Sequence, residues 1–166
     1  MKHRIIRLLA VLWLAALLRL TVFRNGCFRH GLFSGRIEWD AFAYYAKLIR
    51  IAYWRYFTYL FVGNLVWFMP VGVLVRIRAA GSAGRETRPL RKNADKQCLS
   101  VRAALWGFLL SLGIETMQFV LGSGVSELDD LILNTTGAVL GYTLACLWYK
   151  ISKKKRNPLL TKNHRI

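Results

Sequence analysis

The chain is poor in the residue types from which disulfide frameworks and His-based metal centres are built. Only three cysteines and three histidines occur among its 166 residues. No histidine lies near another, and the spacing of the cysteines fits no metal-ligand pattern. We therefore expect no zinc or iron centre, no other metal site and no cofactor.

Acidic residues are scarce as well, with eight Asp and Glu against 25 Lys and Arg, which gives a net charge of +17. A cationic excess of this size can indicate nucleic-acid binding. Here the Lys and Arg residues fall mainly between and beyond long apolar segments, where they indicate membrane topology instead. We therefore expect no nucleic-acid partner.

Long apolar segments are abundant, since 55% of the residues are hydrophobic. Four blocks, residues 5–23, 56–75, 101–121 and 131–149, are long enough, or nearly so, to cross a hydrocarbon layer that needs about 20 helical residues. The pattern predicts an all-α, polytopic membrane protein with four transmembrane helices.

The distribution of cations predicts the orientation of these helices. Lys and Arg precede the first block, fill the segment 76–96 and follow the fourth block, whereas the segment 122–130 has none. Because Lys and Arg accumulate on the cytoplasmic side, we expect both termini in the cytoplasm and residues 122–130 outside. Six cations between residues 24 and 55 run against this rule. With this topology the three cysteines lie outside, inside and within the membrane, so they cannot pair within one molecule.

An extra helix is expected in the outer membrane interface, between the first and second spans. From Asp40 to Tyr56, apolar side chains such as Phe42, Tyr45 and Ile49 recur at three- and four-residue spacing. Tyr and Trp concentrate in the same segment, and these rings are enriched at the depth of the lipid head groups. We interpret the segment as an anchor in the interface. A lid over an outward-facing site is the alternative.

The stretch 111–141 carries polar side chains within two apolar blocks. Ser111, Glu115 and Gln118 share one helical face, and Asp130 and Asn134 share another. A connection of nine residues makes the two helices antiparallel neighbours, so these side chains fall at similar depths in the outer half of the membrane. The expected pocket or polar network comprises Asn64, Glu115, Gln118, Glu127, Asp130, Asn134 and Arg19.

Two interpretations of this polar group remain open. A charged side chain in hydrocarbon is costly and rarely kept without a partner or a function. The polar residues either satisfy one another and fix the register of the helices, or line an outward-opening pocket. Arg19 either extends toward the lipid head groups or faces Glu115 or the acidic loop that follows the third block.

Helix packing is expected to depend on small residues. Gly137 and Gly141 are four residues apart, a spacing that lets a neighbouring helix approach closely. In the second block, Pro70 removes a backbone donor and predicts a kink or local widening next to Gly72.

The order of these residues also resembles a known family. The pattern comprises the segment 64–68, Pro70, Gly72, Ser111, Glu115, Gln118, Glu127, Asp130, Asn134, Gly137 and Gly141, and the sequence LLRLTVFR near the first block. It is similar to the pattern of the VanZ-like family, whose members are small bacterial membrane proteins. The resemblance implies a VanZ-like transmembrane domain over residues 1–149, followed by a basic cytoplasmic tail at 150–166, in the bacterial cytoplasmic membrane. The named member of the family is associated with low-level resistance to the glycopeptide teicoplanin.

Three functions remain open. The favoured one is a non-enzymatic action at the outer leaflet that lowers susceptibility to teicoplanin-class glycopeptides, with membrane lipids and a lipoglycopeptide or lipid-linked cell-wall precursor as partners. The second is an intramembrane enzyme acting on a phospholipid or polyprenyl-phosphate, for which Glu115, Asp129 and Asp130 would supply acid–base groups. It is disfavoured because the chain has no nucleophile elbow and no H-E-x-x-H motif. The third is a small proton-coupled transporter, since an intramembrane Glu can relay protons. The sequence does not indicate the oligomeric state.

Overall fold

The computed structural model describes residues 2–23, 31–83 and 94–156 of the chain, and most of these are helical. The long helices are α1 (Lys2–Thr21), α3 (Trp54–Ala83), α4 (Ala94–Leu121) and α5 (Leu128–Arg156). A short helix, α2 (Ala43–Arg50), and two three-residue strands, β1 (Arg36–Glu38) and β2 (Val125–Glu127), complete the described part. The predominantly helical fold predicted from the apolar blocks is therefore confirmed.

Within the described residues, three helical segments are long and apolar enough to cross a membrane: Trp54–Ala80, Gln97–Leu121 and Leu128–Ser152. They correspond to the last three predicted blocks and begin two to four residues earlier than expected. α1 has the necessary length, with 20 residues, but it includes Lys2 and three arginines. The first of the four predicted spans therefore stays a prediction.

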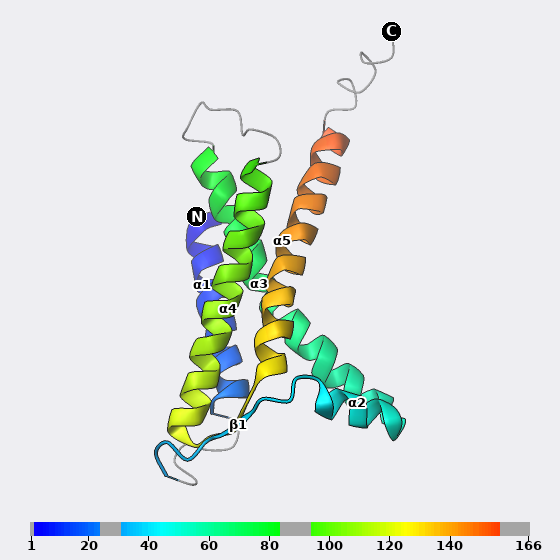
Figure 1. Ribbon diagram of the computed structural model, residues 1–166. Coiled ribbons are helices and arrows are strands. Elements are labelled where there is room, and N and C mark those ends of the chain that lie inside the picture. Colours follow the sequence, from blue (N-terminus) through cyan, green and yellow to red (C-terminus); the bar gives the residue numbers. More distant parts are fainter. Residues whose placement is uncertain (1, 24–30, 84–93, 157–166) are drawn as a thin grey trace.

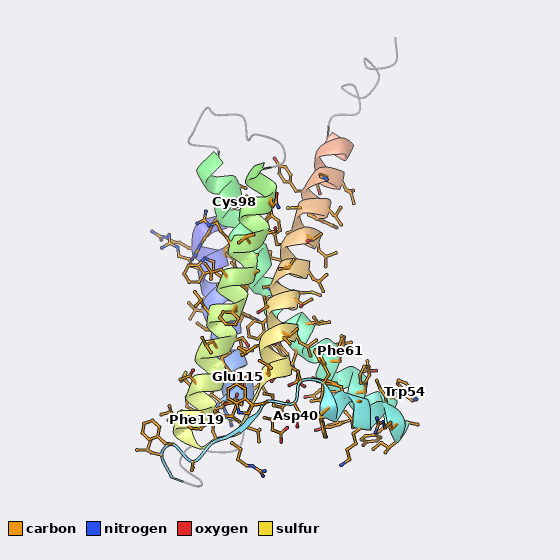
Figure 2. All side chains as sticks on the ribbon, viewed as in Figure 1. Asp40, Trp54, Phe61, Cys98, Glu115 and Phe119 are labelled. Carbon is orange, nitrogen blue, oxygen red and sulfur yellow. The ribbon has the colours of Figure 1, made fainter. Side chains whose placement is uncertain are left out.

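The long helices run alternately in opposite directions, so their ends form two groups (Figure 1). The start of α1, the end of α3, the start of α4 and the end of α5 lie together, and we call this the basic end because it carries Arg78, Arg102 and Lys150. The opposite end, which we call the acidic end, holds α2, β1 and β2. In Figure 2 Glu115 lies near the acidic end and Cys98 at the basic end.

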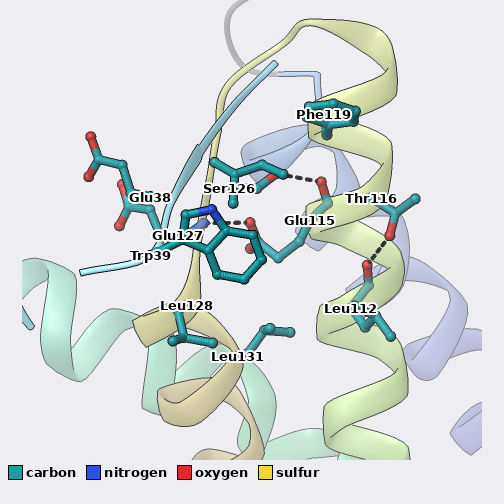
Figure 3. A pocket seen from close by; sticks show the side chains of 11 residues that line it. Glu38, Trp39, Leu112, Glu115, Thr116, Phe119, Ser126, Glu127, Leu128 and Leu131 are labelled. Atoms are coloured by element: carbon teal, nitrogen blue, oxygen red, sulfur yellow. Dashed lines mark hydrogen bonds between the residues drawn. The ribbon is translucent and has the colours of Figure 1, made fainter. Parts of the chain in front are cut away.

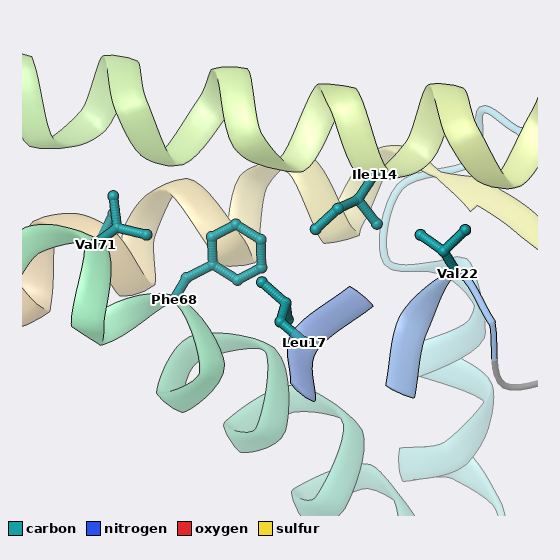
Figure 4. Packing of buried hydrophobic residues seen from close by; sticks show 6 residues of the cluster. Leu17, Val22, Phe68, Val71 and Ile114 are labelled. Carbon is teal, nitrogen blue, oxygen red and sulfur yellow. The ribbon is translucent and has the colours of Figure 1, made fainter. Parts of the chain in front are cut away.

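A small hydrophobic core lies where α1, α3, α4 and α5 meet (Figure 4). Its buried residues are Leu17, Val22, Phe68, Val71, Ile114 and Ala138. Most other large apolar side chains face outward; Leu8 is 60% exposed and Leu144 52%. Apolar helix faces of this kind are unusual on a protein surrounded by water and suit one surrounded by lipid.

Glycines allow α3 and α5 to pack closely along their length. A Cβ atom on Gly72 would lie 1.9 Å from the carbonyl oxygen of Ala138. On Gly137 and Gly141 a Cβ atom would lie 2.3 and 2.0 Å from carbonyl oxygens of α3. Because the opposing atoms are backbone, the three positions leave no room for a side chain. Pro70 lies inside α3, which continues as one helix on both sides of it.

A parallel β ladder at the acidic end has no counterpart in the sequence-based predictions. β1 pairs with β2 so that Arg36 lies opposite Val125 and Glu38 opposite Glu127. The backbone N–H of Gly35 also donates to a carbonyl oxygen near the end of α4, at 3.1 Å. The chain between α1 and α2 is thereby attached to the connection between α4 and α5.

The extra helix between the first two long helices is present but shorter than expected. α2 covers only Ala43–Arg50, because Ala52 adopts a left-handed conformation with φ of 54° and α3 begins afresh at Trp54. The prediction of one continuous helix over residues 40–56 is therefore wrong in its extent. Tyr45 is 4% exposed, because α2 packs its apolar side against α3.

Candidate functional site

The acidic end collects most of the negative charge of the chain. Six of the eight Asp and Glu residues lie there: Glu38, Asp40, Glu115, Glu127, Asp129 and Asp130. Glu115 and Asp129 are only 6% and 5% exposed. A buried carboxyl group needs hydrogen bonds or a partner charge. The contacts of these side chains therefore indicate how the end is built.

Glu115 connects α4 to β2 through two hydrogen bonds (Figure 3). Its side-chain Oε2 accepts a hydrogen bond from the backbone N–H of Glu127 at 3.0 Å, and its backbone oxygen accepts one from Ser126 Oγ at 2.7 Å. In the part of the chain that the structure describes, no Lys or Arg forms an ion pair with Glu115. The carboxyl group is thus held in place by the backbone of β2 rather than by a cation.

Glu115 and Glu127 both line a cavity of about 220 Å³, which we call the acidic-end cavity (Figure 3). The cavity lies between α4, the β1 segment and the start of α5. Most of its remaining wall is apolar or aromatic: Ile37, Trp39, Leu112, Phe119, Leu128 and Leu131. The cavity therefore combines a carboxyl-bearing side with a hydrocarbon wall, and this combination suits an amphiphilic ligand.

A second group of polar side chains clasps the helices together outside this cavity. Asn64 Nδ2 donates a hydrogen bond to Asp130 Oδ1, which joins α3 to α5. Tyr45 of α2 lies beside this pair, since both Asp130 and Asn64 affect the pKa of its hydroxyl group. Asn134 Nδ2 donates to Ser111 Oγ at 2.9 Å, joining α5 to α4. None of these five residues lines the acidic-end cavity.

Two of the predicted site residues lie apart from the carboxyl groups. Gln118 Nε2 donates a long hydrogen bond, 3.4 Å, to the backbone oxygen of Thr21 and so links α4 to α1. Arg19 is exposed, and its guanidinium group donates to the backbone oxygen of Phe23 at 3.0 Å. Arg19 therefore caps the end of its own helix, and the alternative in which it faces Glu115 is wrong.

The seven predicted residues thus divide into separate groups instead of lining one pocket. Glu115 and Glu127 face the cavity, and Asn64, Asp130 and Asn134 belong to the interhelical clasp. Each of the two interpretations left open by the sequence therefore applies to a different subset of the residues.

The surroundings of Glu127 and Tyr45 at the acidic end favour the neutral forms of both side chains. Burial, followed by the negative charges of Asp130 and Asp129, raises the pKa of Glu127 to about 7. Burial and then Asp130 raise the pKa of the Tyr45 hydroxyl above its ordinary value, so Tyr45 remains a neutral hydrogen-bonding group. Near neutral pH, Glu127 is therefore present in both its charged and its protonated form.

Trp39, Tyr45 and Ser126 are not among the site residues predicted from the sequence. Ser126 lies next to Glu127 in the segment 122–130 that is predicted to lie outside, and a search for hydroxyl groups in that segment would have found it. Tyr45 belongs to the apolar face predicted to anchor its segment, although its side chain also carries a hydroxyl group. No local signal indicates Trp39, because its place in the cavity wall depends on the β ladder.

Several polar atoms in this region are buried without a hydrogen-bond partner in the structure: Gln118 Oε1, Ser123 Oγ, Asn134 Oδ1 and Thr135 Oγ1. Among residues 2–23, 31–83 and 94–156, no three His, Cys, Asp or Glu side chains gather in a group that could hold a metal ion.

Comparison with known proteins gives a family match. The sequence profile of the VanZ/LLP1 family matches residues 5–149. The chain belongs to the VanZ/LLP1 family. The match covers most of α1, all of α3 and α4, the acidic end and α5 as far as residue 149. No curated protein and no solved structure matches the chain.

Proposed function

We propose that the chain crosses the bacterial cytoplasmic membrane four times, with both termini in the cytoplasm and the acidic end at the outer face. The alternating direction of the four long helices supports this topology, as does the position of Arg78, Arg102 and Lys150 at the opposite end. α1 would then cross the membrane in addition to α3, α4 and α5, with Arg19 directed toward the outer head groups.

The exposed thiol of Cys98 at the basic end tests this topology. In a Cys27→Ser variant, a membrane-impermeant maleimide should leave Cys98 unlabelled in intact cells. It should label Cys98 once the membrane is opened. Labelling of Cys98 in intact cells would place the basic end outside and refute the topology.

In this orientation, we propose that the protein lowers susceptibility to teicoplanin-class glycopeptides by a non-enzymatic action at the outer leaflet. The acidic-end cavity carries the proposal, because its apolar wall can accept hydrocarbon while Glu115 and Glu127 offer hydrogen-bond acceptors. Teicoplanin-type drugs carry an acyl chain, and the lipid-linked precursor that they bind carries a polyprenyl chain. The cavity would hold the hydrocarbon of one of them at the membrane surface.

Antibiotic susceptibility of a sensitive bacterial host that expresses the protein tests this proposal. Wild-type protein should raise the inhibitory concentration of teicoplanin more than that of a glycopeptide without an acyl chain. Glu115→Gln should reduce the effect, because the carboxyl group at the cavity wall is lost. Gly113→Ala is the matched control on α4, since nothing lies within 4 Å of the added Cβ atom.

Membrane abundance of each variant is measured in parallel, because a loss of protein would mimic a loss of function. Equal protection against both glycopeptides would refute recognition of the acyl chain. Full protection by Glu115→Gln at normal abundance would refute a role for the cavity.

A second function, hydrolysis of a phospholipid or a polyprenyl-phosphate, is favoured by one observation. The raised pKa of Glu127, about 7, lets this carboxyl group take up and release a proton near neutral pH. Glu127 would accept a proton from the attacking water and return one to the leaving group. Purified protein incubated with labelled lipid-linked phosphates should release product with wild type and not with Glu127→Gln; the absence of product with wild type would exclude this function for the substrates tested.

A further inference from the structure

A second cavity lies at the basic end, at the opposite end of the bundle from the acidic-end cavity. α3 and α5 are in contact at Gly72 and Gly141 and diverge beyond them, and Figure 1 shows the end of α5 leaning away from α3 and α4. Between them is a groove of about 770 Å³, which we call the basic-end groove. Its volume falls within the range of about 300–1,000 Å³ that is usual for small-molecule sites.

The wall of the basic-end groove is almost wholly apolar. Its main lining residues are Val73, Ile77, Ala80, Leu144, Leu147 and Trp148. Trp148 is 74% exposed, so the groove is accessible from the surroundings of the helices. A surface of this composition offers an acyl chain the same contacts that the bilayer does, and a groove also fixes the position of the chain.

One cation, Arg76, lies in this apolar wall. Its guanidinium carbon is 4.7 Å from the centre of the Tyr149 ring, which is a cation–π contact across the groove from α3 to α5. Tyr142 on α5 also lies near enough for the positive charge of Arg76 to act on its hydroxyl group. Among the described residues, no carboxylate lies within ion-pair distance of Arg76. A guanidinium group has five N–H donors, and stacking on a ring leaves its edge free to bind an oxyanion.

We propose that the basic-end groove binds an anionic phospholipid, with the phosphate on Arg76 and one acyl chain along α5. The charge of the basic end is complementary to such a head group, since Arg102 and Lys150 lie there with Arg76. Basic pockets between transmembrane helices on the cytoplasmic side are suited to anionic lipids. The inference requires that the helices cross the membrane but is independent of the function of the acidic end.

The same charges argue against a second copy of the chain as the occupant. Two copies that met at this groove would bring two sets of cations, including Arg76 and Lys150, into one apolar interface. Like charges in such a setting repel each other unless an anion intervenes. An anionic lipid supplies that anion, and it is present in every bacterial membrane that the protein would enter.

Tryptophan fluorescence tests the proposal directly, because Trp148 lines the groove. The full-length protein is placed in phosphatidylcholine vesicles that contain a small fraction of either phosphatidylglycerol or phosphatidylcholine with brominated acyl chains. Bromine quenches indole at short range, and the difference between wild type and Trp148→Phe isolates the signal of Trp148. Brominated phosphatidylglycerol should quench Trp148 at about a fivefold lower mole fraction than the brominated neutral lipid, which corresponds to about 1 kcal/mol for one cation at an anionic surface.

Matched variants separate a site from general surface attraction. Arg76→Gln should abolish the preference, whereas Arg76→Lys should keep most of it because the charge remains. Arg78→Gln is the control, since Arg78 is an exposed cation two residues away that does not line the groove. Far-UV circular dichroism verifies that each variant keeps its helices.

Three outcomes would overturn the proposal. Equal quenching of wild type by both lipids would show that the groove has no preference for the anionic head group. Equal loss of preference in Arg76→Gln and Arg78→Gln would show attraction to the whole basic end rather than a site. Absence of Trp148 quenching by either lipid would show that protein, such as a second copy, fills the groove.

Discussion

The substitution Gly72→Ala tests the close contact between α3 and α5 next to the basic-end groove. The added Cβ atom would lie 1.9 Å from the carbonyl oxygen of Ala138 and 2.4 Å from the backbone nitrogen of Tyr142. Ordinary contacts of a Cβ atom begin at 3.4 Å, so the two helices would have to separate by about 1.5 Å. Backbone atoms cannot rotate out of the way as a side chain can.

The expected loss of stability follows from two opposing effects. Overpacking a close contact costs about 1–3 kcal/mol, and a contact with backbone on both sides belongs at the upper end of that range. Alanine in a helix interior gains about 1 kcal/mol over glycine, which offsets part of the cost. We therefore expect Gly72→Ala to lower the free energy of unfolding by about 2 kcal/mol, or Tm by about 4–8 °C for a chain of this size.

Gly63→Ala provides the matched control in the same helix, because nothing lies within 4 Å of the Cβ atom added there. It should leave Tm unchanged or raise it. Thermal unfolding of the detergent-solubilised protein, followed by far-UV circular dichroism, measures both variants. If Gly72→Ala and Gly63→Ala unfold at the same temperature, α3 and α5 are not in contact at Gly72 and the packing described here is wrong.

Three further changes probe the acidic end by the same unfolding assay. Asn64→Ala removes the donor to Asp130 and should lower stability by about 1.5–3 kcal/mol; an unchanged Tm would show that this clasp does not form. Ser126→Ala removes the 2.7 Å hydrogen bond to the Glu115 backbone and should cost about 1 kcal/mol, whereas no cost would mean that β2 is held by the ladder alone. Folding raises the pKa of Glu127 from 4.5 to about 7, so the folded protein binds this proton more tightly than the unfolded chain does. The stability that this group contributes is therefore fully present below pH 4.5 and is lost as the pH rises to 7. Wild type should therefore lose more stability between pH 5 and pH 8 than Glu127→Gln does, and equal losses would contradict the raised pKa.

The long helices and their pairing could be predicted from the sequence because both depend on local patterns. Apolar blocks of about 20 residues specify helices without reference to the rest of the chain. The short connection between the third and fourth blocks makes those helices neighbours, which brings the faces of Ser111 and Asn134 together. The sequence did not specify which polar residues pair across helices, because that depends on rotation and depth to within one turn.

The direction of Arg19 illustrates what a closer local argument would have added. Leu17 is 1% exposed, and a residue two positions later lies about 200° around the helix, on the opposite side. Once Leu17 is assigned to the core, Arg19 must therefore point outward. The sequence does not mark Leu17 as a core residue, because Ala15, Ala16, Leu18 and Leu20 beside it are apolar too.

The β ladder could not be predicted because its pairing is nonlocal and its strands are very short. Three residues do not establish an alternating pattern, and 89 positions separate Arg36 from its partner Val125. The pairing of β1 with β2 also determines which residues form the acidic-end cavity. The ladder places Ile37, Glu38 and Trp39 in the cavity wall, so the cavity could not be predicted without the pairing of β1 with β2.

The ladder also creates a repulsion between two carboxyl groups, and this repulsion is relevant to function. It sets Glu38 directly opposite Glu127, and Glu38 is one of the charges that raise the pKa of Glu127. Like charges opposite each other in a ladder are destabilising, and a shift of one residue in register would separate them. The pairing of Glu38 with Glu127 beside the cavity therefore lowers the stability of the fold, although packing of the two strands does not require these two residues to be acidic. Costs of this kind concentrate at functional sites, because a proton or a ligand group bound there relieves them. The unfavourable pair therefore supports the acidic-end cavity, rather than the interhelical clasp, as the place where this protein acts.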